Sequence, residues 1–558
     1  MGSEGRSRVA AVVQSLGWLG FVLVVMLLNA LLSFGNDWPD IGVVLRPQLA
    51  PEACVLVLGL VVFAHLRGRV PASMCSTWAA VFVLLVLVRY IDVTVPAVLG
   101  RPVNLYWDGR HAWQVLLMAW SGQSAARVLW TGCAVLLGIA ALFLIVRCCA
   151  VWIGGFSSVR GGRLWAVLAG MALPVAFHMW QPWFDREGRP LFADAATPAV
   201  HRAVLQWRDA VSPARQALLL SDSPVEAFAR ADLAALGGGD VLVLFAEAYG
   251  AITLDDGDLA AQLEDARAVL DAAIRRDGRE VVSARVVSPT FGGGSWLAHS
   301  ALLSGVDTAP AGAYETLLAS DRPTLTGHFA RHGYRTVGWM PGLQMPWPEG
   351  AYYGYERIAD VHTLGYRGPA FGYWRVPDQA AMALLHVQEF DSGREQPGRP
   401  RFVVFPTVSS HAPFRPLAPW VDNWAALEHS DAYDAATHAA VLAEPVSWSD
   451  PRPAYVASMR YTLTWLAQYL NERASPDLVL VIVGDHQPVG SVTGPGANWE
   501  VPVHVISANA RLSRTLRERG FIRGVYPAET ALGPMHALTA ILLEAFSKLD
   551  GVEVAVDD

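Results

Sequence analysis

A carboxylate and an imidazole stand side by side in Gly484-Asp485-His486-Gln487-Pro488, near the C-terminal end of the chain. The apolar run before them, residues 477–483, predicts a strand that is buried on both faces. In α/β sheets, ligands bind in the crevice at the carboxyl ends of the strands, which is where this pair is expected. A carboxylate and an imidazole together suit a divalent cation of the zinc or manganese type. The pair is therefore half of a candidate metal site.

Three further reactive side chains follow predicted strands or begin predicted helices. Glu247 ends a near-continuous apolar run, and His411 follows another predicted strand. A glycine-rich turn, residues 290–294, leads to Ser295 at the start of a helix, where backbone N–H groups can bind an anion. Ser295 alone could be an ordinary helix N-cap. Four suitable groups at four such ends together indicate a single site.

The first third of the chain differs in character from the rest, because charged residues are sparsest there. Five apolar stretches each approach the roughly 20 residues that cross a bilayer core. They span residues 16–34, 51–66, 77–99, 127–146 and 164–179. The arginines between them place the N-terminus in the cytoplasm, and five spans then place everything after about residue 182 outside. Arg89 and Asp92, inside the third stretch, are expected to pair with each other or to face an internal cavity.

The chain is thus expected to have three parts. They are a transmembrane region of about five helices over residues 1–181, a connector over 182–238 and an extracytoplasmic domain over 239–558. In the last part, helical and apolar strand patterns alternate, which predicts an α/β fold with a mostly parallel sheet and helices on both faces. All five cysteines fall in the first part, so the outer domain suits an oxidising compartment. The net charge of −8 argues against nucleic acid as a partner.

The order of these motifs resembles the alkaline phosphatase and sulfatase superfamily. The motifs are Glu247, the glycine turn with Ser295, Ser-His-Ala-Pro-Phe around His411, and Gly-Asp-His-x-Pro at residues 484–488. Within the superfamily, the chain is similar to the membrane-anchored branch typified by lipoteichoic acid synthase and the phosphoglycerol and phosphoethanolamine transferases. The resemblance covers about residues 240–549. It implies an alkaline phosphatase-like domain that faces the periplasm from the bacterial inner membrane.

The resemblance also implies roles for individual residues. Glu247, Asp485 and His486 would bind one divalent metal ion, Mn²⁺ or Zn²⁺ with Mg²⁺ also compatible. Ser295 would be both a metal ligand and the nucleophile. His411 would contact the phosphoryl group or the leaving-group oxygen.

Two further residues are candidates for binding the substrate. Trp347 falls where the lipoteichoic acid enzymes have a substrate-contacting tryptophan within Trp-Asn-Arg, but the sequence here is Trp347-Pro348-Glu349 and lacks the arginine. His299, one helical turn after Ser295, is a substitute for His411 as proton donor. The alternative for His299 is a histidine on the helix surface.

The resemblance implies a metal-dependent transferase that moves a phosphoryl-linked headgroup, of phosphoglycerol or phosphoethanolamine type, from a membrane lipid. The acceptor would be an envelope glycan or lipid, and the intermediate a phosphoseryl adduct. One alternative is a phosphodiesterase, phosphatase or sulfatase-like hydrolase that uses water as acceptor. The residues after Ser295 lack the signature from which true sulfatases form formylglycine, so sulfatase chemistry is disfavoured. A second alternative is an inactive scaffold or sensor of envelope assembly.

Overall fold

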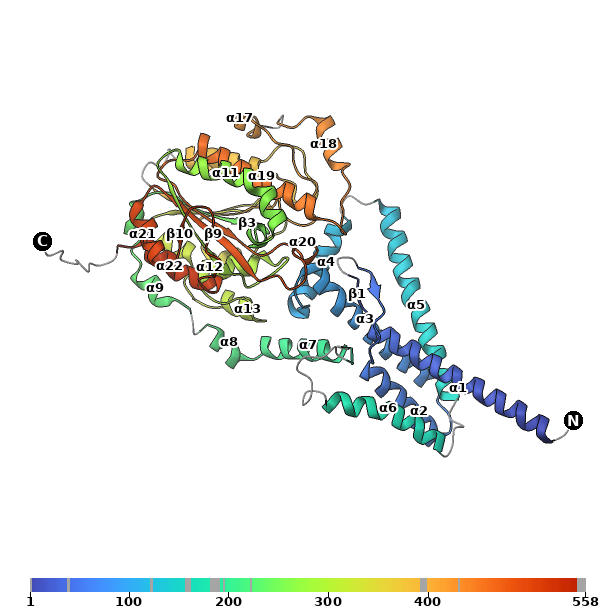
Figure 1. Cartoon of the computed structure of the whole chain (residues 1–558). Helices are drawn as coiled ribbons and strands as arrows, with labels where there is room; N and C mark the ends of the chain where they lie inside the picture. The colour runs from blue at the N-terminus through green and yellow to red at the C-terminus, as the bar shows by residue number, and fades with distance from the viewer. Residues whose placement is uncertain are drawn as a thin grey trace. The chain divides into compact units, whose positions relative to one another are not determined.

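The computed structural model of the chain has two compact units (Figure 1). One unit comprises Met1–Ala97 and Pro102–Leu205, and the other comprises Val98–Arg101 and Gln206–Asp558. The structure describes residues 3–37, 41–120, 124–155, 162–180, 191–193, 196–220, 223–391, 399–429 and 432–548.

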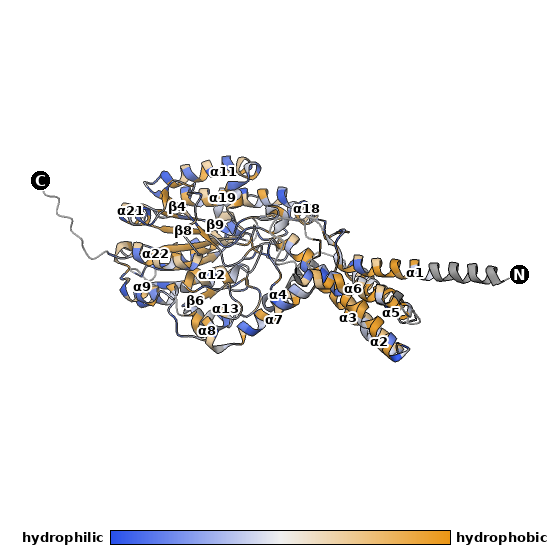
Figure 2. Cartoon of the chain, turned by 60° about the horizontal axis from the view of Figure 1, so that its bottom comes forward, coloured by the Kyte–Doolittle hydropathy of each residue, from blue (hydrophilic) through white to orange (hydrophobic). Residues whose placement is uncertain are grey.

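The first unit consists mainly of apolar helices. They are α1 (Ser3–Ser33), α2 (Pro51–Arg67), α3 (Ala72–Leu99), α4 (Leu105–Trp120), α5 (Ala125–Gly155) and α6 (Gly162–Trp180), with a two-stranded pair β1 (Gly35–Asn36) and β2 (Val43–Val44). Within the described residues, α3 and α5 are long and apolar enough to cross a membrane. The apolar parts of α1 and α6 are shorter, and hydrophobic residues dominate α2, α3 and α5 in Figure 2. The number of five spans therefore stays a prediction.

Arg89 and Asp92 each have another partner in the structure, in place of the ion pair considered above. Arg89 is buried in α3 and donates from Nε and Nη2 to the carbonyl oxygen of Phe34, at 3.0 and 2.8 Å. Asp92 forms an ion pair with Arg202 of α7 (Ala196–Ala210). The sequence could not show this, because both partners come from distant parts of the chain.

The second unit is built on an eight-stranded sheet with the order β10-β4-β9-β8-β3-β7-β5-β6. Strands β8, β3, β7, β5 and β6 are parallel to one another. On the other side of β8, successive neighbours β9, β4 and β10 pair antiparallel. The strands are β3 (Val241–Ala246), β4 (Glu280–Val287), β5 (Arg335–Trp339), β6 (Arg357–Ala359), β7 (Arg401–Pro406), β8 (Val479–Gly484), β9 (Glu500–Ser507) and β10 (Ile522–Arg523). The prediction of an α/β fold with a mostly parallel sheet is confirmed.

Helices cover both faces of this sheet (Figure 1). In β3, Leu242 and Leu244 belong to the core beneath one set of helices, whereas Val241, Val243 and Phe245 belong to the core on the opposite face. The first set includes α11 (Gly257–Arg275), α16 (Asp378–Leu385) and α19 (Arg452–Glu472). The second set includes α12 (Ser295–Ser304), α14 (Leu325–Arg331), α21 (Ala510–Glu518) and α22 (Leu538–Phe546). Burial on both faces explains the continuous apolar strand sequences.

The remaining helices are short. In sequence order, α8 (Pro213–Leu219) and α9 (Val225–Arg230) follow α7 and precede β3, in the part of the chain expected to be the connector. The others are α10 (Ile252–Asp255), α13 (Ala313–Leu318), α15 (Gly350–Tyr353), α17 (Trp424–Leu427), α18 (Ala435–Leu442) and α20 (Gly490–Thr493).

Gly484, the last residue of β8, lets two chain segments approach closely. A Cβ atom at this position would lie 2.0 Å from the carbonyl oxygen of Tyr249 and 3.0 Å from Cβ of Val501. Real Cβ atoms do not approach backbone oxygen so closely, so any side chain here would push apart the segments that follow β3 and β8.

We predict that Gly484→Ala lowers the free energy of unfolding by about 1–3 kcal/mol, the usual range for overpacking a dense core. Denaturant unfolding of the purified chain would measure this loss. Gly257→Ala is the matched control, because a Cβ there meets nothing within 4 Å. Equal unfolding curves for the two variants would contradict the tight contact at Gly484.

Candidate metal centre

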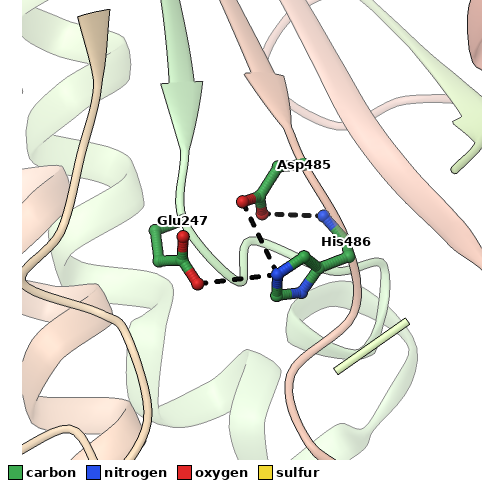
Figure 3. Close-up of side chains that lie close together, drawn as sticks. All are labelled: Glu247, Asp485 and His486. Atoms are coloured by element: carbon green, nitrogen blue, oxygen red, sulfur yellow. Dashed lines mark hydrogen bonds and ion pairs between the residues drawn. The ribbon is translucent and has the colours of Figure 1, made fainter. Parts of the chain in front are cut away.

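Adjacent parallel strands bring the ligands together. Ala246 of β3 lies opposite Gly484 of β8, so the next residues, Glu247 and Asp485, emerge side by side at the same edge of the sheet. With His486 they form a group whose donor atoms all lie within 4.8 Å of one another, and all three residues are buried. Figure 3 shows the two carboxylates and the ring directed toward one another. The imidazole Nε2 lies 3.5 Å from Oε1 of Glu247 and 3.6 Å from Oδ2 of Asp485.

Ser295 completes the cluster. Its Oγ donates to Oε2 of Glu247 at 3.2 Å and lies 3.2 Å from Nε2 of His486. Ser295 is the first residue of α12, and Gly294 is the N-cap without a side-chain capping bond. The interpretation of Ser295 as an ordinary N-cap is therefore wrong. Three consecutive glycines with positive φ, residues 292–294, turn the chain so that α12 starts at the cluster.

Hydrogen bonds orient the histidine and one carboxylate for binding a cation. Nδ1–H of His486 donates to the carbonyl oxygen of Gln487 at 2.7 Å, which leaves Nε2 free to act as a ligand. Oδ1 of Asp485 accepts from the backbone N–H groups of Ala248 and His486, at 2.8 and 2.7 Å. Oδ2 of Asp485 is buried and accepts no hydrogen bond from the described residues. A buried oxygen without a partner costs free energy, and a bound cation would remove that cost.

The electrostatics also favour a cation. Burial, followed by the nearby carboxylate of Asp485, raises the pKa of Glu247 well above its usual value. Two neighbouring buried carboxylates repel each other when both are ionised, and this costs free energy unless a cation binds between them. Carboxylate, imidazole and hydroxyl donors together fit a divalent ion that accepts both oxygen and nitrogen ligands, such as Zn²⁺ or Mn²⁺. The residues present thus fit the expected metal.

The loop that carries His411 is fastened to the same cluster. After β7, Oγ1 of Thr407 accepts from N–H of Glu247 at 2.9 Å, and Oγ of Ser410 donates to the carbonyl oxygen of Glu247 at 2.6 Å. The His411 ring packs against Trp374, with 4.4 Å between centroids. Burial lowers the pKa of His411 to about 4, and its Nδ1–H donates to the carbonyl oxygen of Ala412 at 2.7 Å. At neutral pH the ring is therefore uncharged, with Nε2 unprotonated.

Sequence reasoning missed Asp378, which holds this loop. Asp378 is fully buried at the start of α16, and its two carboxylate oxygens accept from the N–H groups of Val408 and Ser409, each at 2.8 Å. Burial raises the pKa of Asp378 to about 6, although these hydrogen bonds lower it. The only signal in the sequence is an acidic residue after a proline at a helix start, which is common and does not indicate a contact with another loop.

Of the other two sequence candidates, His299 lies within α12 and Trp347 lies outside it. The ring of His299 packs on Phe245 of β3, with 4.2 Å between centroids, and its Nε2 is buried without a partner among the described residues. Burial lowers the pKa of His299 to about 4, which does not suit a histidine on the helix surface. Trp347 stacks on Tyr353, whose hydroxyl lies 2.5 Å from Oγ of Ser300 in α12. It is therefore part of the aromatic packing that supports the helix of Ser295.

The comparisons with known proteins found similar solved structures but no sequence match. No family model and no curated protein sequence matches the chain. Similar solved structures include the integral membrane protein lipooligosaccharide phosphoethanolamine transferase A from Neisseria meningitidis (14% identity, TM-score 0.43, 84% of each chain covered). Others are the lipoteichoic acid synthase LtaP from Listeria monocytogenes (13%, 0.32, 56% of this chain and 75% of that one) and an alkaline phosphatase superfamily protein from Vibrio parahaemolyticus (16%, 0.33, 54% and 69%). These neighbours are alkaline phosphatase superfamily members.

We predict that Asp485→Asn abolishes stoichiometric binding of Mn²⁺ or Zn²⁺, whereas Asp477→Asn, at an exposed position before β8, leaves it unchanged. Elemental analysis after equilibration with each metal would measure occupancy. Because Glu247 has a raised pKa and a cation binds its ionised form, occupancy should rise with pH and fall on acidification. Equal occupancy in both variants would rule out this metal centre.

Proposed function

We propose that the chain is a metal-dependent enzyme that transfers a phosphoryl-linked headgroup, of phosphoglycerol or phosphoethanolamine type, from a membrane lipid to an envelope glycan or lipid. The observation that carries this proposal is the hydroxyl of Ser295, placed within hydrogen-bonding distance of both Glu247 and His486 at the start of a helix. An alcohol in contact with a buried set of metal ligands is the arrangement of an activated nucleophile.

A divalent cation held by Glu247, Asp485 and His486 would supply positive charge that favours the ionised hydroxyl of Ser295 and stabilises the phosphoryl oxygens. The positive-φ turn at residues 292–294 and the N-terminus of α12 add backbone N–H groups suited to an anion.

In the first step, Oγ of Ser295 bonds to the phosphorus of the donor lipid. The bond from phosphorus to the diacylglycerol oxygen breaks, and that oxygen gains the proton that Ser295 gives up.

The second step returns the enzyme to its starting state. An acceptor hydroxyl attacks the phosphorus, the bond to Oγ of Ser295 breaks, and the headgroup phosphate leaves on the acceptor. Nε2 of His411, unprotonated at neutral pH, is suited to take the proton of the acceptor hydroxyl, and this proton then restores Ser295. We assign His411 this role as a base, because the ring does not carry a proton at Nε2 to give to the first leaving group.

We further propose a multi-pass protein of the bacterial inner membrane, with residues 1–181 as the transmembrane region, 182–238 as the connector and 239–558 as the periplasmic catalytic domain. Support comes from the apolar length of α3 and α5 and from the arginines that flank the apolar stretches. Outside the cytoplasm, lipid headgroups are the phosphoryl donors at hand, since ATP is absent there.

We predict that the purified chain, mixed with phospholipid vesicles, forms a covalent adduct on Ser295 whose mass matches a glycerophosphoryl or phosphoethanolamine group. Mass spectrometry of the peptide that contains Ser295 would identify the adduct. Ser295→Ala should form none, and Ser295→Thr should retain the reaction because it keeps an alcohol. A bare phosphate adduct would instead favour a phosphatase with water as acceptor, and no adduct with metal bound would favour an inactive scaffold.

We predict that Asp378→Asn lowers adduct turnover on the order of ten- to a hundredfold without loss of metal, because an amide cannot accept both N–H groups and the loop of His411 shifts. Turnover of a chromogenic phosphodiester and elemental analysis would measure the two effects. Asp434→Asn is the control, since Asp434 also accepts a backbone N–H at a helix start, in α18. Loss of metal in Asp378→Asn would contradict the separate role assigned to this residue.

A further inference from the structure

Helix α7 carries one stripe of exposed apolar side chains. Val200, Val204, Trp207 and Val211 have 44, 59, 55 and 66% of their surface exposed. Their spacings of four, three and four residues place them on one face of a helix with a 3.6-residue period. Val211 follows the last residue of α7, and its N–H donates to the carbonyl oxygen of Trp207 at 3.1 Å, so the helical geometry reaches it. A row of four exposed apolar side chains is unfavourable in water unless another surface covers it.

Small residues at the two ends of α7 make close contacts within the protein. Ala196 and Ala210 are buried, with 0 and 6% exposure. A Cβ at Gly312 would come within 2.9 Å of the Cα of Ala210, which shows that the C-terminal end of α7 is closely packed. The helix therefore uses its small residues to pack and presents its large apolar residues outward.

Polar contacts tie the first turns of α7 to one end of two apolar helices. Oε1 of Glu52, in the first turn of α2, accepts from N–H and Oγ1 of Thr197 at 3.0 and 2.5 Å. Arg202 pairs with Asp92 in the C-terminal half of α3. Glu52 and Asp92 lie toward the ends of α2 and α3 that are opposite the turn joining the two helices. Arg67 and Arg69 lie at that turn, and the positive-inside rule places it in the cytoplasm. The start of α7 is thus at the external end of these two helices.

We propose that α7 lies in the external surface of the lipid bilayer, with its apolar stripe in the boundary between headgroups and acyl chains. The proposal rests on the membrane placement given under Proposed function, and it is independent of the transfer reaction. A tryptophan suits that boundary, because its ring is apolar and its N–H is polar. Arg208 and Arg215, whose side chains are 56% exposed, flank the stripe and can contact lipid phosphates while paired with Asp209.

Depth-dependent quenching would test this arrangement in the full chain. The five cysteines are replaced, one cysteine is introduced by Val204→Cys or by Asp209→Cys, and an environment-sensitive fluorophore is attached. Asp209 is the control because it lies about 140° around the helix from Val204. Each protein is placed singly in phospholipid nanodiscs, with or without lipids that carry a spin label in the acyl chain.

We expect blue-shifted emission and strong loss of fluorescence on spin-labelled lipid at position 204, with much weaker loss at position 209. Blue-shifted emission at position 204 without quenching would mean that protein covers the stripe and would overturn the proposal. Water-like emission at position 204 would overturn it as well. Metal occupancy and the Ser295 adduct are measured on the same samples, so failure of the lipid contact is distinguishable from failure of the proposed reaction.

Discussion

The approach of two buried carboxylates, Glu247 and Asp485, is the interaction on which the rest of the candidate metal centre depends. Paired parallel strands end at the same level, so the side chains that follow them meet whether or not their charges suit each other. The backbone accommodates this meeting at Ala248, a non-glycine residue with φ of 53°. The N–H of Ala248 donates to the carboxylate of Asp485, so this hydrogen bond stabilises the strained residue between β3 and its loop.

The loops around this pair are fastened to one another and not only to the sheet. The carbonyl oxygen of Gln487 accepts both from Nδ1 of His486 and from N–H of Gly292, at 2.7 and 3.1 Å. Oγ of Ser288 donates to the carbonyl oxygen of Asp485 at 2.5 Å. The glycine turn before Ser295 is therefore attached to the loop that carries Asp485 and His486. This attachment fixes Ser295 relative to Asp485 and His486, which is the preorganisation that the proposed phosphoryl transfer would require.

The sequence predicted the parts of the site that depend on local pattern. A polar residue at or shortly after the end of a buried strand is visible in the chain, and this pattern predicted Glu247, Asp485 and His411. The sequence could not show that β9 and β4 pair antiparallel, because strands buried on both faces look alike in parallel and antiparallel sheets. Asp378 was missed for a different reason: its function lies in a contact with a loop some thirty residues away. Long-range contacts between polar groups leave no periodic signal.

For the proposed reaction, the site offers separate residues for binding a cation and for moving a proton. Glu247, Asp485 and His486 form a buried group that gains stability from a cation, and the serine hydroxyl is bonded directly to it. His411 lies in the loop that follows the neighbouring strand β7, and burial keeps it neutral by lowering its pKa to about 4. A histidine bound to the cation could not accept a proton, whereas one fixed by Ala412 and packed on Trp374 keeps Nε2 available. The proposed nucleophile would have to be both activated and regenerated, and this division would serve both needs, because a single group cannot stabilise negative charge and accept a proton at the same time.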